Sequence, residues 1–357
     1  MKRFFAEERN GYLETIQEGL NGVRRFRDGI SAETGTRQEN LLKLKRELET
    51  ADAIVIGAGA GLSTSAGLTY SGERFHRYFF DFEKTFGITD MYSGGFYPFP
   101  DDETRWAWWA RHIYFNRYVD APKPVYQQLL ARVKEKEYFV ITTNVDHQFQ
   151  RVGFDRQRLF YTQGDYGLFQ SVNPRMQKTY DNEAWVMRAM AAMGFVRDEN
   201  GVFQLPEDGA VAMRIPTELI PKCPDDGSDV TTNLRADDSF VEDEGWHAAS
   251  RRYAEFLDRH RTGHVLYLEL GVGANTPVII KYPFWAMTNQ NSSAVYACLN
   301  YGESFCPEQI KEQSICIDGD IGAALRWVPV FLGMARACPA GPGTPPGTCP
   351  SRPGTPG

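Results

Sequence analysis

The feature that most constrains this chain is a short apolar run that ends directly in glycines. Residues 53–56 (Ala-Ile-Val-Ile) are followed at once by the glycine-rich segment 57–67. A continuous apolar run of this length predicts a parallel strand that is buried on both faces. Glycines after such a strand allow a tight turn and let the backbone come close to a bound phosphate. This part of the chain therefore predicts a sheet domain with a ligand at its edge.

Four further apolar runs follow along the chain, and segments with helical periodicity separate them. The clearest helical segment is residues 37–48, in which Leu41, Leu44 and Leu48 share one face. Strands that alternate with helices predict an α/β fold built on a doubly wound, Rossmann-like parallel sheet. The other expected strands are residues 138–143, 264–270, 294–299 and 314–317, and the other expected helices are residues 125–134 and 246–260.

Two segments break this rhythm and predict a smaller module inserted into the sheet domain, over the carboxyl edge of its strands. Residues 70–115 are rich in aromatic side chains, and residues 165–235 combine polar loops with one expected helix at residues 182–193. The predicted division is a helical N-terminal extension (1–36), the Rossmann-like sheet domain (37–69, 116–164 and 236–330), the inserted module (70–115 and 165–235) and a disordered tail rich in Pro, Gly and Thr (338–357).

Charge, length and cysteine usage argue against several classes of protein. The formal net charge of the 357-residue chain is −7, so we expect no nucleic-acid partner, because phosphate binding needs a basic surface. The apolar runs are far shorter than a membrane span, and charged residues follow the first five positions too closely for a signal peptide. We therefore expect a cytoplasmic protein with no membrane partner. The six cysteines form no C-x-x-C pair, so we expect no metal site.

The glycine-rich segment alone is a weak indication of a ligand, since many such segments are only tight turns between a strand and a helix. A dehydrogenase of the Rossmann type would also carry an acidic residue about 20 residues further on, at the end of the next strand, to bind a ribose. No acidic residue ends an expected strand at that distance here. Hydride transfer is therefore disfavoured.

Several motifs, in order along the chain, resemble those of the sirtuins. Residues 59–67 (Gly-Ala-Gly-Leu-Ser-Thr-Ser-Ala-Gly) are similar to the sirtuin G-A-G-x-S…A-G segment, and residues 143–146 (Thr-Asn-Val-Asp) are similar to Q-N-I-D. Residues 271–273 stand where sirtuins have G-T-S, residues 299–300 match their I-N pair, and residues 318–320 lie near the adenine end. The resemblance covers about residues 40–330 and implies NAD as the cofactor.

The departures from the deacetylase pattern concern the catalytic base, an aromatic screen and the zinc ligands. Gln163 stands where deacetylases have a histidine before glycine, and an amide cannot take a proton at neutral pH. The sequence after Gly67 lacks the aromatic residue that screens nicotinamide at its usual place. The two zinc-binding C-x-x-C pairs are reduced to Cys223 alone. A deacetylase is therefore disfavoured.

This combination resembles the class M sirtuins, a microbial branch linked to protein ADP-ribosylation. Its strings L-T-Y-S-G-E-R-F, T-N-V-D-H-Q-F and T-Q-G-D-Y-G stand at residues 68–75, 143–149 and 162–167. The resemblance implies a protein substrate similar to the lipoylated glycine-cleavage H protein, and a macrodomain hydrolase that reverses the mark. It also implies catalytic roles for Asn144 and Gln163.

The motifs together predict one site at the carboxyl ends of the strands. Asn144, Gln163 and Asp146 are the expected catalytic residues, with Asp146 or Asp165 supplying negative charge near the reacting ribose. The predicted cofactor-binding residues are Gly59, Ala60, Gly61, Ser63, Gly67, Tyr70, Asn144, Asp146, Gly271, Val272, Asn300 and Asp320.

Several readings stay open at the level of sequence. His147 is either a base or a structural hydrogen-bonding residue, and Asn144 is either catalytic or the cap of a strand end. The alternatives to a protein ADP-ribosyltransferase are an NAD hydrolase with water as acceptor, a weak sirtuin-type protein deacylase, and a sensor that binds NAD or ADP-ribose without turnover.

Overall fold

The computed structural model describes residues 29–273 and 277–328. The predicted disordered tail lies outside these residues, as do the first 28 residues of the predicted helical extension. The described part of that extension, residues 29–36, is not helical. There β1 (Ile30–Ser31) pairs antiparallel with β12 (Cys306–Pro307).

The centre of the fold is a six-stranded parallel sheet in the order β13-β11-β10-β2-β3-β4. The chain leaves β2 towards one edge and returns at β10 on its other side, so the strand order reverses between these two strands. In doubly wound sheets, ligands bind at the carboxyl ends of the strands at this reversal. The strands are β2 (Ala53–Ala58), β3 (Tyr138–Thr142), β4 (Leu159–Tyr161), β10 (Val265–Leu270), β11 (Val295–Asn300) and β13 (Ser314–Asp318).

The sheet confirms the predicted fold class and all five expected strands, and it adds β4. This strand has three residues, and a period of two cannot be recognised over so short a run. The expected strands are buried along nearly their whole length, which explains why they are continuous apolar runs and do not alternate with polar residues.

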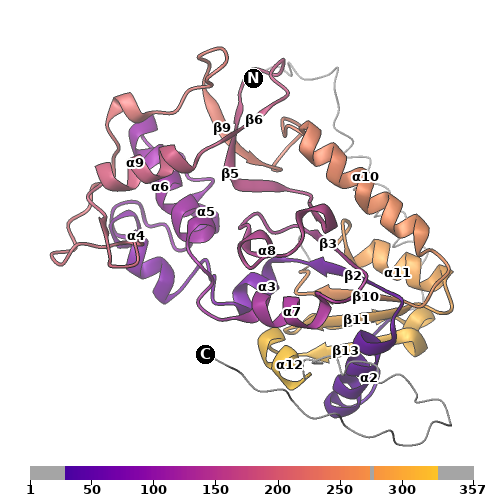
Figure 1. Ribbon diagram of the computed structural model, residues 1–357. Helices are drawn as coiled ribbons and strands as arrows, with labels where there is room; N and C mark the ends of the chain where they lie inside the picture. The colour runs from indigo at the N-terminus through magenta and orange to yellow at the C-terminus, as the bar shows by residue number, and fades with distance from the viewer. Residues whose placement is uncertain (1–28, 274–276, 329–357) are drawn as a thin grey trace, which may run out of the picture.

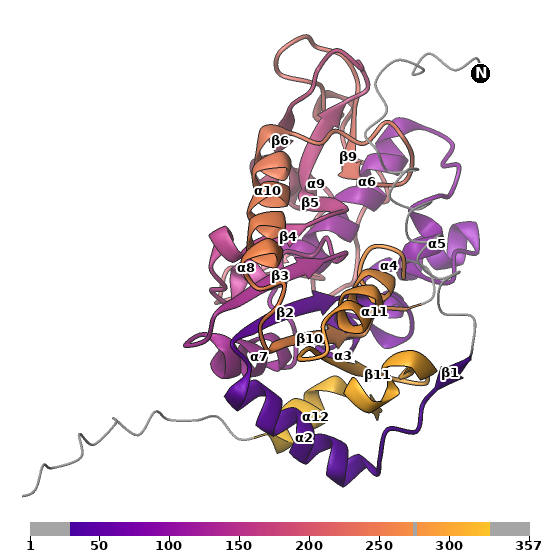
Figure 2. The same cartoon turned by 90° about the vertical axis from the view of Figure 1, so that its right-hand side faces the viewer.

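Helices cover both faces of the sheet (Figures 1 and 2). One core contains Ile54 and Ile56 of β2 with the predicted leucine face of α2; the other contains Val55 with Phe256 and Phe284. The helices of the first face are α2 (Arg37–Thr50), α7 (Val125–Val133) and α12 (Ile321–Trp327), and those of the second are α10 (Glu244–Arg259) and α11 (Lys281–Gln290). Short helices lie between strands: α3 (Ala60–Ser65), α8 (Gln148–Arg151), η2 (Arg156–Arg158) and η4 (Glu308–Gln313).

A second body with its own aromatic core is built from residues 75–115 and 166–230 (Figure 1). Trp108 lies at the centre of this core, with its ring centroid 4.5 Å from that of Phe79 and 5.1 Å from that of Phe82. Its helices are α4 (Glu73–Phe86), α5 (Met91–Gly94), α6 (Asp102–Ile113), η1 (Tyr114–Tyr118), α9 (Glu183–Ala192) and η3 (Thr217–Leu219), and its strands are β5 (Gly164–Ser171), β6 (Thr179–Asp181), β7 (Val196–Arg197), β8 (Phe203–Gln204) and β9 (Val230–Leu234).

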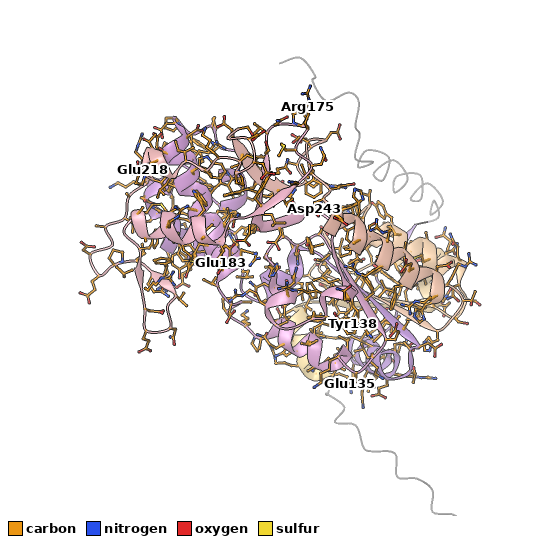
Figure 3. All side chains as sticks on the ribbon, turned by 45° about the horizontal axis from the view of Figure 1, so that its top comes forward. Glu135, Tyr138, Arg175, Glu183, Glu218 and Asp243 are labelled. Carbon is orange, nitrogen blue, oxygen red and sulfur yellow. The ribbon has the colours of Figure 1, made fainter. Side chains whose placement is uncertain are left out.

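The two bodies meet along β5, β6 and the start of α10. Glu183 and Glu218 lie on one body and Glu135 and Tyr138 on the other, with Asp243 between them (Figure 3). The Asp243 carboxylate caps α10 through the backbone N–H of Trp246 and also accepts a hydrogen bond from Thr179 Oγ1 of β6, at 2.5 Å. This contact sets the small body over the sheet domain.

Candidate active site at the carboxyl ends of β2, β3 and β10

The predicted glycines join two loops of the protein. Gly61 N donates to Gly271 O at 2.9 Å, and a Cβ added to Gly61 would lie 2.7 Å from Gly271 Cα. A Cβ on Gly59 would lie 2.6 Å from Gly271 O, and Gly271 itself has φ +65°. The loops after β2 and β10 therefore require glycine for their own approach, whether or not a phosphate is bound nearby.

A buried polar cluster stands where β3 ends, and it contains three of the predicted residues. Ser63 Oγ donates to Asp146 Oδ2 at 2.5 Å and lies 2.8 Å from the hydroxyl of Tyr126. Asn144 Nδ2 lies 3.1 Å from Ser63 Oγ and donates to Gly59 O at 3.0 Å. The side chains predicted from two separate motifs, residues 59–67 and 143–146, thus form one hydrogen-bonded unit.

These contacts hold the Asn144 side chain in one orientation. Its Nδ2 has acceptors in Gly59, Ser63 and Tyr126, while its backbone N–H donates to Thr142 Oγ1 at 3.0 Å. Within the described part of the chain, Asn144 Oδ1 accepts no hydrogen bond and is not closed off from solvent. An oriented, open amide oxygen of this kind can accept a hydrogen bond from a hydroxyl group of a ligand.

Asp146 is a buried carboxylate with few partners. It is 5% exposed, and besides Ser63 it accepts a hydrogen bond from Gln148 N at 3.2 Å. Burial raises the pKa of the Asp146 carboxyl above its ordinary value. A negative charge on Asp146 therefore costs stability, a situation that is common in active sites.

The remaining strand-end residues are tied to the fold by hydrogen bonds. Asn300 Nδ2 donates to Val272 O at 3.0 Å, which joins the ends of β10 and β11. Asp320 caps α12 through Ala323 N and accepts from Ser65 Oγ at 2.8 Å. Ala60 is exposed at the start of α3, and Gly67 turns with φ +91° just after its end.

Tyr70 lies in the small body, within a buried network that the sequence did not predict. Its hydroxyl lies 2.7 Å from that of Tyr166, which in turn lies 2.9 Å from His112 Nε2. Burial raises the pKa of Tyr70 to about 12 and, with Arg74, lowers that of His112 to about 3. All three side chains are thus neutral hydrogen-bonding groups at physiological pH.

In the described part of the chain, Gln163 makes no hydrogen bond to the cluster around Asp146. It lies in the turn between β4 and β5, its backbone carbonyl accepts from Arg235 N at 3.1 Å, and its side chain is partly exposed. No hydrogen bond to another described residue holds the Gln163 amide. Two residues later, Asp165 makes close contacts with His147 and Arg117, so Gln163 begins a segment that is otherwise firmly held.

Sequence reasoning missed Tyr126 and Arg117. Tyr126 is a fully buried member of α7, and its hydroxyl contacts both Ser63 and Asn144. Its position on the apolar face of a helix is typical of a core residue. A buried tyrosine hydroxyl nevertheless needs a polar partner, and this was the available signal. Arg117 lies outside every motif, and no feature of the sequence around it indicated a role in the site.

Cys223 lies in the small body without a set of metal ligands around it. Its thiol is buried and lies 3.4 Å from the hydroxyl of Tyr180. Among residues 29–273 and 277–328, no three His, Cys, Asp or Glu side chains gather as a metal ion would require. Across the described ranges 29–273 and 277–328, no helix is long and apolar enough to cross a membrane.

We expect purified protein to contain less than about one zinc ion per chain, because a structural zinc site needs four nitrogen or sulfur ligands. Elemental analysis after mild chelation measures this directly. Stoichiometric zinc that resists the chelator would contradict the expectation and would place ligands outside the described residues.

Comparison with known proteins identifies the family. No family model matches the chain. A curated relative from Staphylococcus aureus, named protein ADP-ribosyltransferase, is 36% identical over 284 residues, which are 79% of this chain and 84% of that protein. A relative from Fusarium oxysporum f. sp. cubense, named probable bifunctional ADP-ribose hydrolase/ADP-ribosyltransferase, is 29% identical over 83% of this chain; the chain spans 49% of its length.

Among solved structures, a Sir2 homologue in complex with NAD overlaps 80% of this chain and 93% of its own, with a TM-score of 0.49 and 15% identity. The relative from Staphylococcus aureus shows the family, because it is 36% identical to this chain and the match covers 84% of its length. The chain therefore belongs to the family of the Staphylococcus aureus protein ADP-ribosyltransferase.

Proposed function

We propose that this protein transfers ADP-ribose from NAD to a side chain of another protein. The name of the relative from Staphylococcus aureus supports this activity. The observation that carries the proposal is the cluster of Ser63, Asn144 and Asp146, which presents an oriented amide oxygen beside a buried carboxylate. Gln163, in place of the histidine of a deacetylase, separates this site from deacetylation.

The residues at the strand ends fit NAD. Ala60 is exposed where α3 begins, and the glycines on either side of it, Gly59 and Gly61, have no side chain to keep a phosphate away from the backbone. Among the described residues, a Cβ added to Gly273 would meet only Glu303 Oε2, at 3.6 Å. The Asn144 amide oxygen is open to a ribose hydroxyl. We assign the pyrophosphate to the loops of Gly59–Gly61 and Gly271–Gly273.

The chemistry follows from the charges of the site. Breaking the bond between nicotinamide and ribose develops positive charge on the ribose, and a fixed negative group lowers the energy of that state. Asp146 is such a group, buried beside Asn144 and pinned by Ser63. Asn144 then orients the ribose by accepting from one of its hydroxyls. Bond cleavage by this route needs no strong base.

The acceptor that we propose is a lipoyl-carrier protein similar to the glycine-cleavage H protein, as the class M motifs imply. A macrodomain hydrolase would remove the mark. The relative from Fusarium supports this pairing, since its name joins an ADP-ribose hydrolase with an ADP-ribosyltransferase. A cytoplasmic location completes the proposal. NAD hydrolysis with water as acceptor is the second candidate, because the same open Asn144 oxygen would orient a water molecule.

We expect label transfer from NAD to a lipoylated carrier protein, and little deacetylation of an acetyl-lysine peptide. Asn144→Ala and Gln163→Ala should each lower transfer, since losses of positioning reach about 10²-fold. The measurement is label on the carrier, with free ADP-ribose and nicotinamide followed in the same reactions. Free ADP-ribose without labelled carrier would instead favour the NAD hydrolase.

Matched controls lie at the opposite edge of the sheet. Asn291 donates to Gly263 O at 2.9 Å near the start of β11, and Gln157 lies in η2, before β4. Asn291→Ala and Gln157→Ala should therefore keep transfer near the level of the unmodified protein. Strong deacetylation by the unmodified protein, or full transfer by both site variants, would contradict the mechanism.

A further inference from the structure

His147 has the geometry of an oriented base, which the proposed function has not used. It follows Asp146 directly, and its Nδ1 contacts Asp165 Oδ2. Asp165 is itself held by Arg117 Nε at 2.6 Å and by Gly167 N at 2.7 Å, both on its other oxygen. A carboxylate that orients an imidazole in this way is the arrangement by which a histidine becomes a general base.

The protonation states of the pair follow from these contacts. Burial works against the charge of Asp165, but the hydrogen bond with His147 and the charge of Arg117 hold its pKa below the ordinary value. Asp165 is therefore an ionised acceptor, and Nδ1 of His147 must donate to it. In the neutral ring the other nitrogen, Nε2, then carries the lone pair.

Nε2 is also the nitrogen that is open. Within residues 29–273 and 277–328 it makes no hydrogen bond and is not closed off from solvent, although the His147 side chain is only 17% exposed. The charged groups that face His147 are Asp165 of β5, Arg117 of η1 through Asp165, and Asp146 at the end of β3. Through its Nδ1 contact, the imidazole thus joins the segment of Asn144 and Asp146 to the segment of Gln163 and Asp165.

The backbone of His147 is unusual as well. Its φ of +62° makes it the one non-glycine residue in the described part of the chain with a left-handed backbone. Such a conformation is uncommon for residues other than glycine and persists only where the surroundings impose it, often at functional sites. With this backbone conformation, the imidazole of His147 contacts Asp165 of β5.

We infer that His147, oriented by Asp165, is the general base that deprotonates the acceptor, in place of the histidine that Gln163 has replaced. This inference rests on the proposed function. As the bond between C1′ and nicotinamide breaks, the acceptor atom bonds to C1′ and its proton passes to Nε2. Nicotinamide leaves neutral, because its ring nitrogen takes the electron pair of the broken bond. The proton on Nε2 then passes to solvent.

This role restricts the acceptor to groups that carry a proton on the attacking atom, such as a hydroxyl, an amine or a thiol. A carboxylate acceptor has no proton to lose and would not need the base. The same base would serve a water molecule, so hydrolysis of NAD should depend on His147 too.

The test uses His147→Asn and His147→Gly, since both residues tolerate a left-handed backbone. With labelled NAD and a lipoylated carrier protein, we expect label transfer to fall by about 10²–10⁴-fold in both variants. Added imidazole should restore transfer in His147→Gly, and the stabilisation of each variant by NAD in a thermal-shift titration should be unchanged. A residue with a purely structural role would not respond to imidazole.

His264→Asn is the matched control. His264 also contacts a carboxylate, with its Nε2 2.6 Å from Glu47, but it lies at the amino end of β10, away from the site. This variant should transfer at the rate of the unmodified protein. Transfer by His147→Asn at the parent rate and pH profile would overturn the inference, as would a loss that imidazole does not restore. An unmodified protein that labels no carrier and releases no nicotinamide would instead overturn the proposed function.

Discussion

Asp146→Asn is expected to lower the release of nicotinamide from NAD by about 10²–10³-fold, the loss typical of removing one preorganised electrostatic contact to a transition state. The asparagine has nearly the same shape and can still accept from Gln148 N. Its Nδ2 takes the place of the oxygen to which Ser63 donates, so that contact can persist only with the amide as donor. What disappears is the negative charge beside the reacting ribose. The measurement is the initial rate of nicotinamide release at saturating NAD.

The same variant should not be less stable than the parent. The pKa of Asp146 is raised in the folded protein, so its carboxyl is destabilising once the pH exceeds its ordinary value, where the unfolded chain ionises more readily. Removing the charge therefore leaves the melting temperature at neutral pH unchanged or higher. Asp155→Asn, at an exposed cap of η2 near the amino end of β4, serves as the control and should keep the full rate. An unchanged rate in Asp146→Asn would show that the charge plays no part in bond cleavage.

Lys281→Met is expected to destabilise the fold by about 3–5 kcal/mol, because it leaves a buried charge without its partner. Lys281 Nζ lies 2.6 Å from Glu269 Oε1, and the two side chains are 2% and 0% exposed. Tyr296 donates to the other carboxylate oxygen at 2.5 Å. The pair joins the start of α11 to the middle strands of the sheet, and the measurement is the free energy of unfolding in denaturant.

Two comparisons separate this pair from an ordinary ion pair. The double variant Lys281→Met with Glu269→Gln removes both charges and should recover much of the loss. Lys311→Met breaks an exposed pair with Glu308, at 3.8 Å, and should change stability by about 1 kcal/mol or less. Equal losses from Lys281→Met and Lys311→Met would contradict the prediction.

The contribution of Lys281 should also depend on pH. Burial opposes its charge, but the facing groups Cys298 and Glu269 more than offset burial and raise the pKa of Lys281 above its ordinary value of 10.5. A raised pKa in the folded state means that the stabilisation is fully present below pH 10.5 and is lost as the pH rises through the folded value. The unmodified protein should therefore lose stability at strongly alkaline pH more steeply than the double variant.

The elements that sequence predicted well are those in which one local rule decides. The buried strands are continuous apolar runs because helices cover both of their faces. The helix α2 has leucines at helical spacing because only one of its faces packs against the sheet. The strand β4 escaped prediction because three residues carry no period. Gly59, Gly61 and Gly271 were predicted from the sequence as cofactor-binding residues. Their closest contacts are between the loop after β2 and the loop after β10, which only the fold shows.

The sequence by itself determined the doubly wound fold, the family and the chemical types available at the strand ends, because these depend on residues close together in the chain. Tertiary structure decided how those residues act. Only the fold brings Ser63 and Tyr126 to Asn144 and Asp146, and only the fold sets Asp165 against His147, 18 positions away. Hydrogen bonds and burial give each side chain its orientation and charge, and both depend on neighbours that are distant in sequence.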